Sequence, residues 1–307
     1  MKPLATIQVD IDSFWILLRF YGYQSNIDKF NTIYEIAIPR IRQIFKKYNV
    51  KATFFVIGKD LEIETNRKII TELINDGHEI ANHTMTHAYG FSQLSKKEKE
   101  REIRECEELI YNVTGSYPVG FKAPGWDIDS YTIDILEKRG YKYDSSVFPS
   151  YFQILYKVIS RILNSNIKDS FIDKCLNFLA PLDLYYPHKD KIWKHGPKRK
   201  IVEIPLTVTP YLRLPFYANF HLLMGQKSFD LCYQLLKGKF INYSFHAIEL
   251  VDFKKDKLDQ RLSKHPNINL PLNKKISFYE HVINKISKDY ELCLSCILID
   301  RILVNKM

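Results

Sequence analysis

Two histidines four positions apart, His83 and His87, are the side chains whose types and spacing first suggest chemistry. They lie in the segment His-Glu-Ile-Ala-Asn-His-Thr-Met-Thr-His at 78–87. If this segment is helical, positions i and i+4 share a face, so both imidazoles can reach one point. Two converging imidazoles favour a divalent metal, with zinc the best fit, a third ligand, and an open fourth position if the site is catalytic. The alternative is a pair of surface histidines or a helix cap.

Two aspartates close the first apolar run, Leu-Ala-Thr-Ile-Gln-Val-Asp-Ile-Asp at 4–12. Because side chains alternate along a strand, Asp10 and Asp12 should point the same way. Two like charges at one strand end are unfavourable unless a cation or a shared proton compensates them. The pair therefore predicts a compensating partner, and a solvated strand end is the alternative.

These residues need a scaffold that gathers strand ends, and the first half of the chain alternates strand-like and helical segments. We expect strands at 4–12, 52–57, 79–82, 120–123 and 141–143. We expect helices at 32–48, 66–76 and 130–139, and a long helix from Ser95 with a Ser95/Glu98 capping box. This alternation predicts a parallel sheet or barrel, with its active site at the carboxyl ends of the strands. Several polar residues lie at or just beyond such ends: Asp10, Asp12, His83, Lys122 and Asp144.

The rhythm breaks between residues 148 and 200. Apolar residues recur there at helical spacing, first at Tyr151, Leu155, Ile159, Ile162 and Leu163, and then at Phe171, Cys175, Phe178 and Leu179. Basic and aromatic residues crowd 185–195. A helical, amphipathic, basic insertion suits a membrane surface. A cap subdomain packed on the barrel is the alternative.

The remaining segments complete a single domain over 1–307. Strands are expected at 201–206 and 240–246, the latter ending in His246, with a helix at 228–236 between them. We expect a last helix that is capped by Ser277 and Glu280 and runs to about Lys288. We expect a closing strand at 292–299. The loop at 252–275 is polar, so we expect it to be external.

Composition places the chain among ordinary globular proteins. It has 307 residues, of which 46% are hydrophobic, 14% aromatic and 26% charged, and its net charge is +10. A positive balance favours anionic partners such as phosphate-bearing substrates or an acidic lipid surface. No nucleic-acid recognition motif accompanies the charge, so nucleic acid is not an expected partner.

The five cysteines are scattered, which favours a reducing compartment. Cys293 and Cys296 lack the second pair that a zinc site needs, so we interpret them as core thiols. The sequence shows neither a signal-peptide pattern nor a run of about 18 apolar residues. We therefore expect a cytoplasmic protein, either free or peripheral on the inner face of the cell membrane.

With these residues placed, the chain resembles the polysaccharide deacetylase family, the NodB-homology group also known as carbohydrate esterase family 4. Five segments carry the resemblance, in order: Val-Asp-Ile-Asp at 9–12, His-Thr-Met-Thr-His at 83–87, Phe-Lys-Ala-Pro-Gly-Trp at 121–126, Tyr-Asp-Ser-Ser at 143–146 and Ser-Phe-His-Ala at 244–247. The resemblance implies an α/β fold, a distorted (β/α)7 barrel.

The resemblance also implies a role for each matching position. Asp12, His83 and His87 would bind a divalent metal, with Zn²⁺ favoured and Co²⁺, Mn²⁺ or Ni²⁺ as alternatives. Asp10 would be the general base, oriented by Lys122 and Asp144, and His246 the general acid. Gly125 and Trp126 would bind the substrate and the oxyanion.

Two departures from the family pattern bear on the substrate. The chain has Asp-Ile-Asp where adjacent aspartates are common, as in the branch that deformylates lipid-linked aminoarabinose. Lys122 replaces the usual arginine and so loses its bidentate fork.

We therefore expect a metal-dependent hydrolase that removes an acetyl or formyl group from an amino sugar. The favoured substrate is a sugar linked to polyprenyl (undecaprenyl) phosphate at the cytoplasmic membrane face, in a bacterial lipid A or envelope pathway. Peptidoglycan, another polysaccharide or a soluble sugar is the alternative substrate. A non-catalytic carbohydrate- or lipid-surface-binding module is the alternative class.

Overall fold

One parallel sheet organises the computed structural model, which describes residues 2–24, 32–154, 176–265 and 267–305. In this described part the strand order is β6-β5-β4-β3-β2-β1-β7, and β8 pairs with the start of β1. The strands are β1 (Leu4–Asp10), β2 (Thr53–Val56), β3 (Glu79–Asn82), β4 (Gly120–Phe121), β5 (Tyr143–Asp144), β6 (Val202–Glu203), β7 (Ile241–His246) and β8 (Glu291–Leu292).

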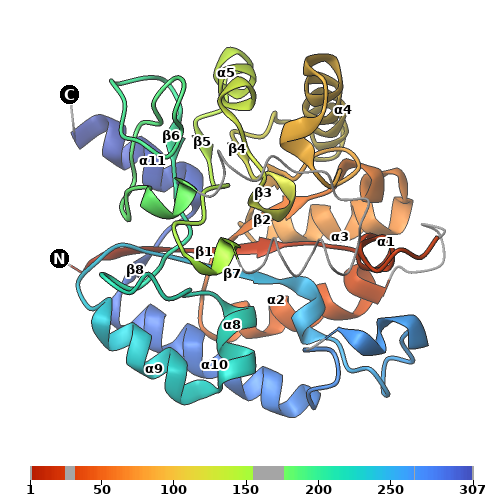
Figure 1. Cartoon of the computed structure of the whole chain (residues 1–307). Helices are drawn as coiled ribbons and strands as arrows, with labels where there is room; N and C mark the ends of the chain where they lie inside the picture. Colours follow the sequence, from red (N-terminus) through yellow and green to blue (C-terminus); the bar gives the residue numbers. More distant parts are fainter. Residues whose placement is uncertain (1, 25–31, 155–175, 266, 306–307) are drawn as a thin grey trace.

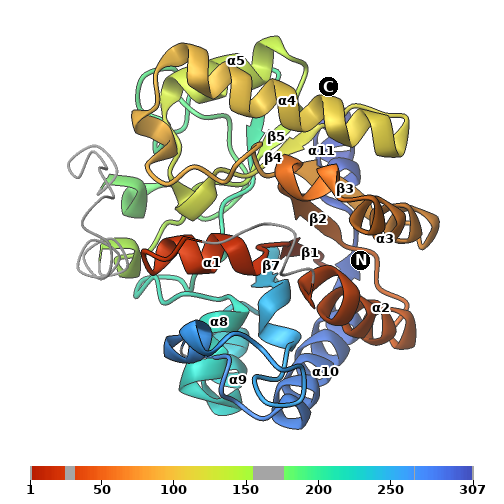
Figure 2. The same ribbon diagram turned by 90° about the vertical axis from the view of Figure 1, so that its right-hand side faces the viewer.

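Helices cover the outside of this sheet, as Figures 1 and 2 show. They are α1 (Phe14–Phe20), α2 (Ile38–Lys47), α3 (Glu64–Asn75), α4 (Lys96–Thr114), α5 (Ser130–Lys138), α8 (Ala218–Met224), α9 (Gln226–Leu235), α10 (Leu272–Asp289) and α11 (Ser295–Asn305). The expected α/β class is confirmed, with the parallel strands curved into a half-barrel. All paired strands in the described part run parallel, so their carboxyl ends meet at one rim.

The central strand β1 has an apolar outer row. Ala5, Ile7 and Val9 are fully buried and belong to one core cluster with the inner faces of α2 and α10. Burying one large aliphatic side chain contributes about 1.5–3 kcal/mol. The amphipathic helices therefore fix the position of the strand.

The inner row of the same strand is polar and runs Thr6, Gln8, Asp10. The Thr6 hydroxyl donates to Asn242 Oδ1 (3.2 Å), and Gln8 Oε1 accepts from the Ser145 hydroxyl (3.0 Å). Because side chains alternate with a period of two, the residue that follows Gln8 on this row is Asp10. The barrel interior is thus hydrogen-bonded below the point where the carboxylate of Asp10 emerges.

Of the two helix N-caps predicted from the sequence, one is confirmed and the other is wrong. The Ser95/Glu98 capping box is confirmed at the start of α4, with each residue bonding the other's backbone amide. The predicted cap at Ser277 and Glu280 is wrong, because α10 begins at Leu272 and both residues lie inside it. A Ser-x-x-Glu pattern also fits the solvent-facing side of a continuing helix, and there it carries no boundary information.

The predicted closing strand at 292–299 is also wrong. Strand β8 has two residues, and Ser295 begins helix α11, in which Leu298 and Ile299 are buried. A short apolar run does not by itself distinguish a strand from a buried helix. Cys293 is buried and Cys296 partly buried; burial raises the pKa of the two thiols to about 11 and about 12, as expected of core thiols.

The insertion at 148–200 is described only in part, because most of its predicted helical pattern lies at 155–175, outside the described residues. From 176 onward it contains a 3₁₀ turn (Leu176–Leu179) and isolated bridges such as Tyr185 with Glu203. The loop at 252–275 is not wholly external as predicted, since Leu262, Asn267 and Ile268 are buried. Within the described residues, no helix has the length and apolarity needed to cross a membrane.

Candidate metal and catalytic site

The segment that carries His83 and His87 is a loop and not the predicted helical turn. It follows β3 directly, and both Thr84 (φ 67°) and His87 (φ 48°) have left-handed backbone conformations. Two hydrogen bonds support the turn: the Thr84 amide donates to Asn82 Oδ1 (2.8 Å), and the His87 amide donates to Thr84 Oγ1 (3.1 Å). A strained β-branched residue held by its neighbours is typical of a functional loop.

Asp12, His83 and His87 form a buried cluster despite the different local structure. Each offers one ligand atom, and these atoms lie within 4.8 Å of one another. His83 Nε2 is 3.5 Å and His87 Nε2 is 3.7 Å from Asp12 Oδ1. One carboxylate and two imidazoles make a three-ligand set that leaves further positions open, as a catalytic zinc-type site requires.

The hydrogen-bonding state of these groups fits a cation. His83 Nδ1 lies 2.7 Å from the carbonyl oxygen of Lys122, so Nδ1 carries a proton and Nε2 is the ring nitrogen that can bind a metal. Asp12 Oδ1 is buried without a hydrogen-bond partner among the described residues. Burial also lowers the pKa of His87 to about 3, which keeps that imidazole neutral. Lone pairs that converge in this way need a positive partner.

Asp10 forms an ion pair with Lys122 beside this cluster. Lys122 Nζ donates to Asp10 Oδ1 (2.6 Å) and to Ser244 Oγ (3.2 Å), and it lies 4.2 Å from the centre of the Phe55 ring. The lysine is only 2% exposed. A lysine this deeply buried is not a surface group, and its main effect is to compensate the Asp10 carboxylate.

His246 lies at the end of β7, opposite Asp10 in the strand register. Its Nε2 is 3.8 Å from Asp10 Oδ2 and 3.8 Å from Asp12 Oδ2. Its Nδ1 is 3.5 Å from Glu249 Oε1. Burial alone would lower the pKa of His246, but the neighbouring carboxylates of Glu249, Asp12 and Asp10 raise it to about 9.

Glu249 is a site residue that the sequence reasoning missed. It is fully buried, follows His246 by three positions, and accepts a short hydrogen bond from the Tyr279 hydroxyl. A carboxylate behind the second ring nitrogen fixes the orientation of an imidazole and favours its protonated form. A carboxylate just after a strand-end histidine was the available signal in the sequence.

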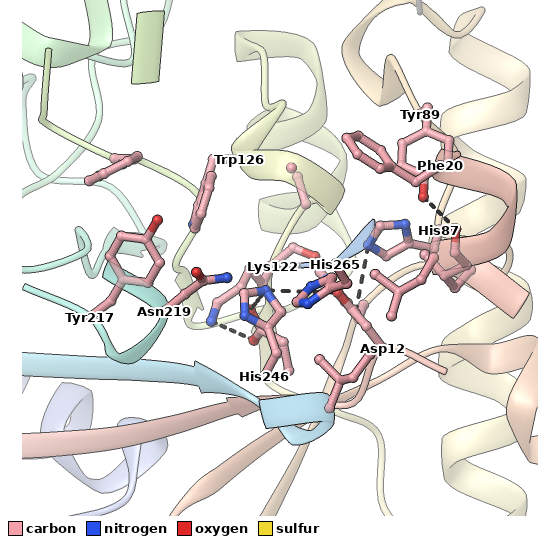
Figure 3. Close-up of a pocket in the computed structure, with 18 of the residues that line it drawn as sticks. Asp12, Phe20, His87, Tyr89, Lys122, Trp126, Tyr217, Asn219, His246 and His265 are labelled. Carbon is pink, nitrogen blue, oxygen red and sulfur yellow. Dashed lines mark hydrogen bonds and ion pairs between the residues drawn. The ribbon is translucent and has the colours of Figure 1, made fainter. Parts of the chain in front are cut away.

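Asp144 lies deeper than the other predicted site residues. Its Oδ1 accepts from the Ser146 hydroxyl (2.5 Å), and among the described residues it forms no ion pair with Lys122. The other eight predicted residues all line one pocket of about 410 Å³, namely Asp10, Asp12, His83, His87, Lys122, Gly125, Trp126 and His246. Figure 3 shows the labelled side chains converging there.

The walls of this pocket are largely apolar and aromatic. Trp126 packs against Phe148 and Tyr217 at ring distances of 5.0 and 5.9 Å. Gly125 (φ 59°) and Trp126 (φ 55°) form a left-handed turn at the edge of the site. His265, from a loop expected to be external, also lines the pocket. Burial lowers its pKa to about 4, so it is a neutral wall residue.

Comparisons with known proteins agree with this geometry. The family model for polysaccharide deacetylase matches residues 29–143. A peptidoglycan deacetylase from Helicobacter pylori is 33% identical over 156 residues, covering 50% of this chain and 52% of that protein. A peptidoglycan deacetylase-like protein from Gibberella zeae is 26% identical over 247 residues, covering 75% and 66%. The matched part thus spans about half the length of the first relative.

A solved structure of a proposed polysaccharide deacetylase from Mycobacterium smegmatis has the same fold. It superimposes with a TM-score of 0.62 at 17% identity, covering 100% of this chain and 92% of that one. The chain is therefore similar to polysaccharide deacetylases over part of its length, as the family model and the curated relatives both indicate. The expected aminoarabinose deformylase branch receives no support from these matches.

Proposed function

We propose that this protein is a metal-dependent N-deacetylase of amino sugars. One observation carries the proposal: a three-ligand cluster, a lysine-paired aspartate and a glutamate-paired histidine meet in one pocket. This combination supplies a cation site, a base and an acid within reach of one bond. An amide needs all three, because its carbonyl must be polarised, a nucleophile activated and an amine protonated.

Asp12, His83 and His87 would hold the cation. A divalent metal bound there supplies Lewis acidity for an acyl oxygen and for water. His83 is oriented for this by its bond to the Lys122 carbonyl. Zn²⁺ suits one carboxylate and two imidazoles, as the sequence predicted, while Co²⁺, Mn²⁺ and Ni²⁺ remain the alternatives.

Asp10 would take the proton of the attacking water. Its Oδ1 is engaged by Lys122, so Oδ2 is the oxygen available to accept. As the new carbon–oxygen bond forms, the carbon–nitrogen bond weakens and the leaving nitrogen needs a proton. His246 is protonated at neutral pH and can donate from Nε2, while Glu249 holds Nδ1. The turn at Gly125 and Trp126 would contact the substrate and the developing oxyanion, as the resemblance implied.

An N-acetylated amino-sugar polymer such as peptidoglycan is the substrate we favour. The two curated relatives named above are a peptidoglycan deacetylase and a peptidoglycan deacetylase-like protein, and this observation outweighs the initial preference for a lipid-linked sugar. The aromatic wall around Trp126 and Tyr217 suits sugar rings, because aromatic faces pack well against the apolar faces of such rings.

A lipid-linked amino sugar is the second candidate, and an apolar lip on the pocket favours it. Phe152 and Leu223 both line the pocket and stay exposed, at 36% and 53%. Tyr151, Leu212 and Met224 nearby in sequence are exposed as well. Such a patch suits a polyprenyl phosphate chain, and this substrate would place the enzyme at the inner membrane face. Cells without the protein would then accumulate a lipid-linked sugar heavier by one acetyl or formyl group, detectable by mass spectrometry.

Release of free amine by the purified full chain tests the favoured function. We expect deacetylation of N-acetylglucosamine oligomers or peptidoglycan, its loss with a chelator, and its return on adding Zn²⁺ or Co²⁺. Metal analysis of the purified protein should find about one ion per chain. The same analysis of an Asp12→Ala variant should find a lower metal content. A chain that binds metal and sugar but releases no amine would be the non-catalytic module considered above.

A further inference from the structure

Two carboxylic acids face each other at the carboxyl ends of β5 and β6. Asp144 and Glu203 are register partners on these adjacent parallel strands, and both are fully buried. Side chains that are paired in neighbouring strands project to the same face of the sheet. The fold therefore forces two acids together away from water.

No cation in the described part of the chain compensates them. Neither carboxyl forms an ion pair there, and Asp144 Oδ2 and Glu203 Oε2 are both buried without a hydrogen-bond donor. A further titratable group, Tyr185, bridges to Glu203 through its backbone, and its own hydroxyl donates to the Ile192 carbonyl. Two uncompensated carboxylates side by side cannot both be ionised, so one proton must lie between them.

Burial favours the protonated form of both acids. Burial first, and then the neighbouring Asp144 carboxylate, raise the pKa of Glu203 well above its usual range. Burial also raises the pKa of Asp144, although hydrogen bonds from Glu203 and Ser146 oppose that effect. The two acids thus retain a proton between them.

The outer oxygens of the pair hold the polypeptide that lines the pocket. Asp144 Oδ1 accepts from the Ser146 hydroxyl, whose oxygen in turn accepts from the Ala123 amide (2.8 Å). Glu203 Oε1 accepts from the Val147 amide (2.9 Å). Ala123 is the N-cap of the short 3₁₀ turn Pro124–Trp126, in which Gly125 and Trp126 both have positive φ.

We propose that Glu203 is a positioning residue that shares one proton with Asp144 and, through Ser146, fixes the Ala123–Trp126 wall of the catalytic pocket. Its effect on turnover rests on the proposed deacetylase function. The shared proton itself does not, and it can be measured in the absence of any activity.

Thermal unfolding between pH 5 and pH 9 tests the shared proton. An acid whose pKa is higher in the folded than in the unfolded chain binds extra protons when folded, so stability falls as pH rises above its ordinary value of 4.5. In Glu203→Gln the amide can donate to Asp144 and accept from Val147 without titrating. The melting temperature of Glu203→Gln minus that of wild type should therefore increase by roughly 3–6 °C between pH 5 and pH 9.

Glu107→Gln is the matched control, because Glu107 is also buried but has Arg139 as a cationic partner. The melting temperature of Glu107→Gln relative to wild type should not increase as pH rises. A Glu203→Gln difference that stays constant with pH, or that matches the control, would overturn the shared proton.

Turnover tests the positioning role. Glu203→Gln should keep kcat within about threefold of wild type, whereas Glu203→Ala should lower kcat about tenfold with unchanged metal content. A folded Glu203→Ala protein with wild-type kcat would overturn positioning. If Glu203→Ala does not fold, a tenfold loss of kcat in Glu203→Gln would overturn the positioning role instead. If wild type has no activity at all, the proposed function fails while the pH dependence of unfolding still decides the shared proton.

Discussion

Two pairs of acids lie at the same rim of the sheet and are compensated in opposite ways. Asp10 and Asp12 meet cationic or cation-seeking partners, namely Lys122, His246 and the imidazoles of His83 and His87. Within the described residues, Asp144 and Glu203 meet each other and backbone or hydroxyl donors. Both pairs are buried, so burial alone does not make an acid reactive.

The difference lies in what each form of compensation leaves available. A cation neutralises a carboxylate without occupying both of its oxygens, so Asp10 keeps one oxygen towards the pocket. A proton shared between two acids occupies their facing oxygens, and the remaining oxygens hold the backbone in place. In the proposed reaction Asp10 of the first pair can therefore accept a proton at the pocket, whereas the second pair holds the backbone in place.

Asp10→Asn breaks the first pair and should have the largest effect on turnover. The amide cannot accept a proton as a carboxylate does, so kcat should fall about 10³-fold, within the range for general bases. The ligands Asp12, His83 and His87 are untouched, so metal analysis should find the wild-type content. Near-normal rates would show that Asp10 is not the base. The comparison variant is Asp12→Asn, which should lose both bound metal and activity.

Glu249→Gln weakens the cationic partner of the first pair and should cost about 10- to 100-fold in kcat. His246 must be protonated to act as the acid, and the protonated fraction falls as pH rises through its pKa of about 9. Without the Glu249 carboxylate that pKa falls, so the alkaline limb of the rate profile should move to lower pH. Rates measured from pH 6 to pH 10 check this. An unmoved limb would mean that Glu249 does not set the protonation of His246.

Asp60→Asn sharpens the comparison with an acid that forms no ion pair among the described residues. Asp60 accepts from Ser13 Oγ (2.6 Å) and Trp15 Nε1 (2.7 Å), and burial outweighs these donors and raises its pKa to about 7. Wild type should therefore lose stability between about pH 4 and pH 7, and the variant should not.

Between pH 5 and pH 8, the free energy of unfolding of Asp60→Asn relative to that of wild type should rise by on the order of 2 kcal/mol. We expect kcat to stay within about threefold of wild type. Denaturant unfolding at pH 5 and pH 8 measures it. An equal difference at the two pH values would show that the Asp60 carboxyl titrates normally in the folded chain.

The parts of the site that follow from strand ends could be predicted from the sequence. Asp10, Asp12, His83, Lys122 and His246 converge because parallel strands bring their carboxyl ends to one rim, whatever the local loop. The local loop itself was not predictable from spacing. His83 and His87 meet through a left-handed turn that Asn82 and Thr84 stabilise, and not through a helix.

Contacts between distant segments were out of reach of the sequence. Glu203 opposes Asp144 only because β6 returns beside β5 after the insertion, and periodicity does not reveal strand order. His265 reaches the pocket from a loop whose polar composition suggested solvent. The closing run at 292–299 shows the converse limit, since a buried helix and a buried strand share the same apolar residues.

Lys122 contacts both halves of the proposed catalytic site, through its carbonyl oxygen to His83 and through its ammonium group to Asp10. Its own amide also donates to the Asn82 carbonyl (3.0 Å), at the residue just before His83. A single residue thus serves as the common reference point for a metal ligand and for the base. Thermal displacement of this stretch of backbone carries both groups in the same direction, so their spacing tolerates motions that would misalign two independently anchored side chains.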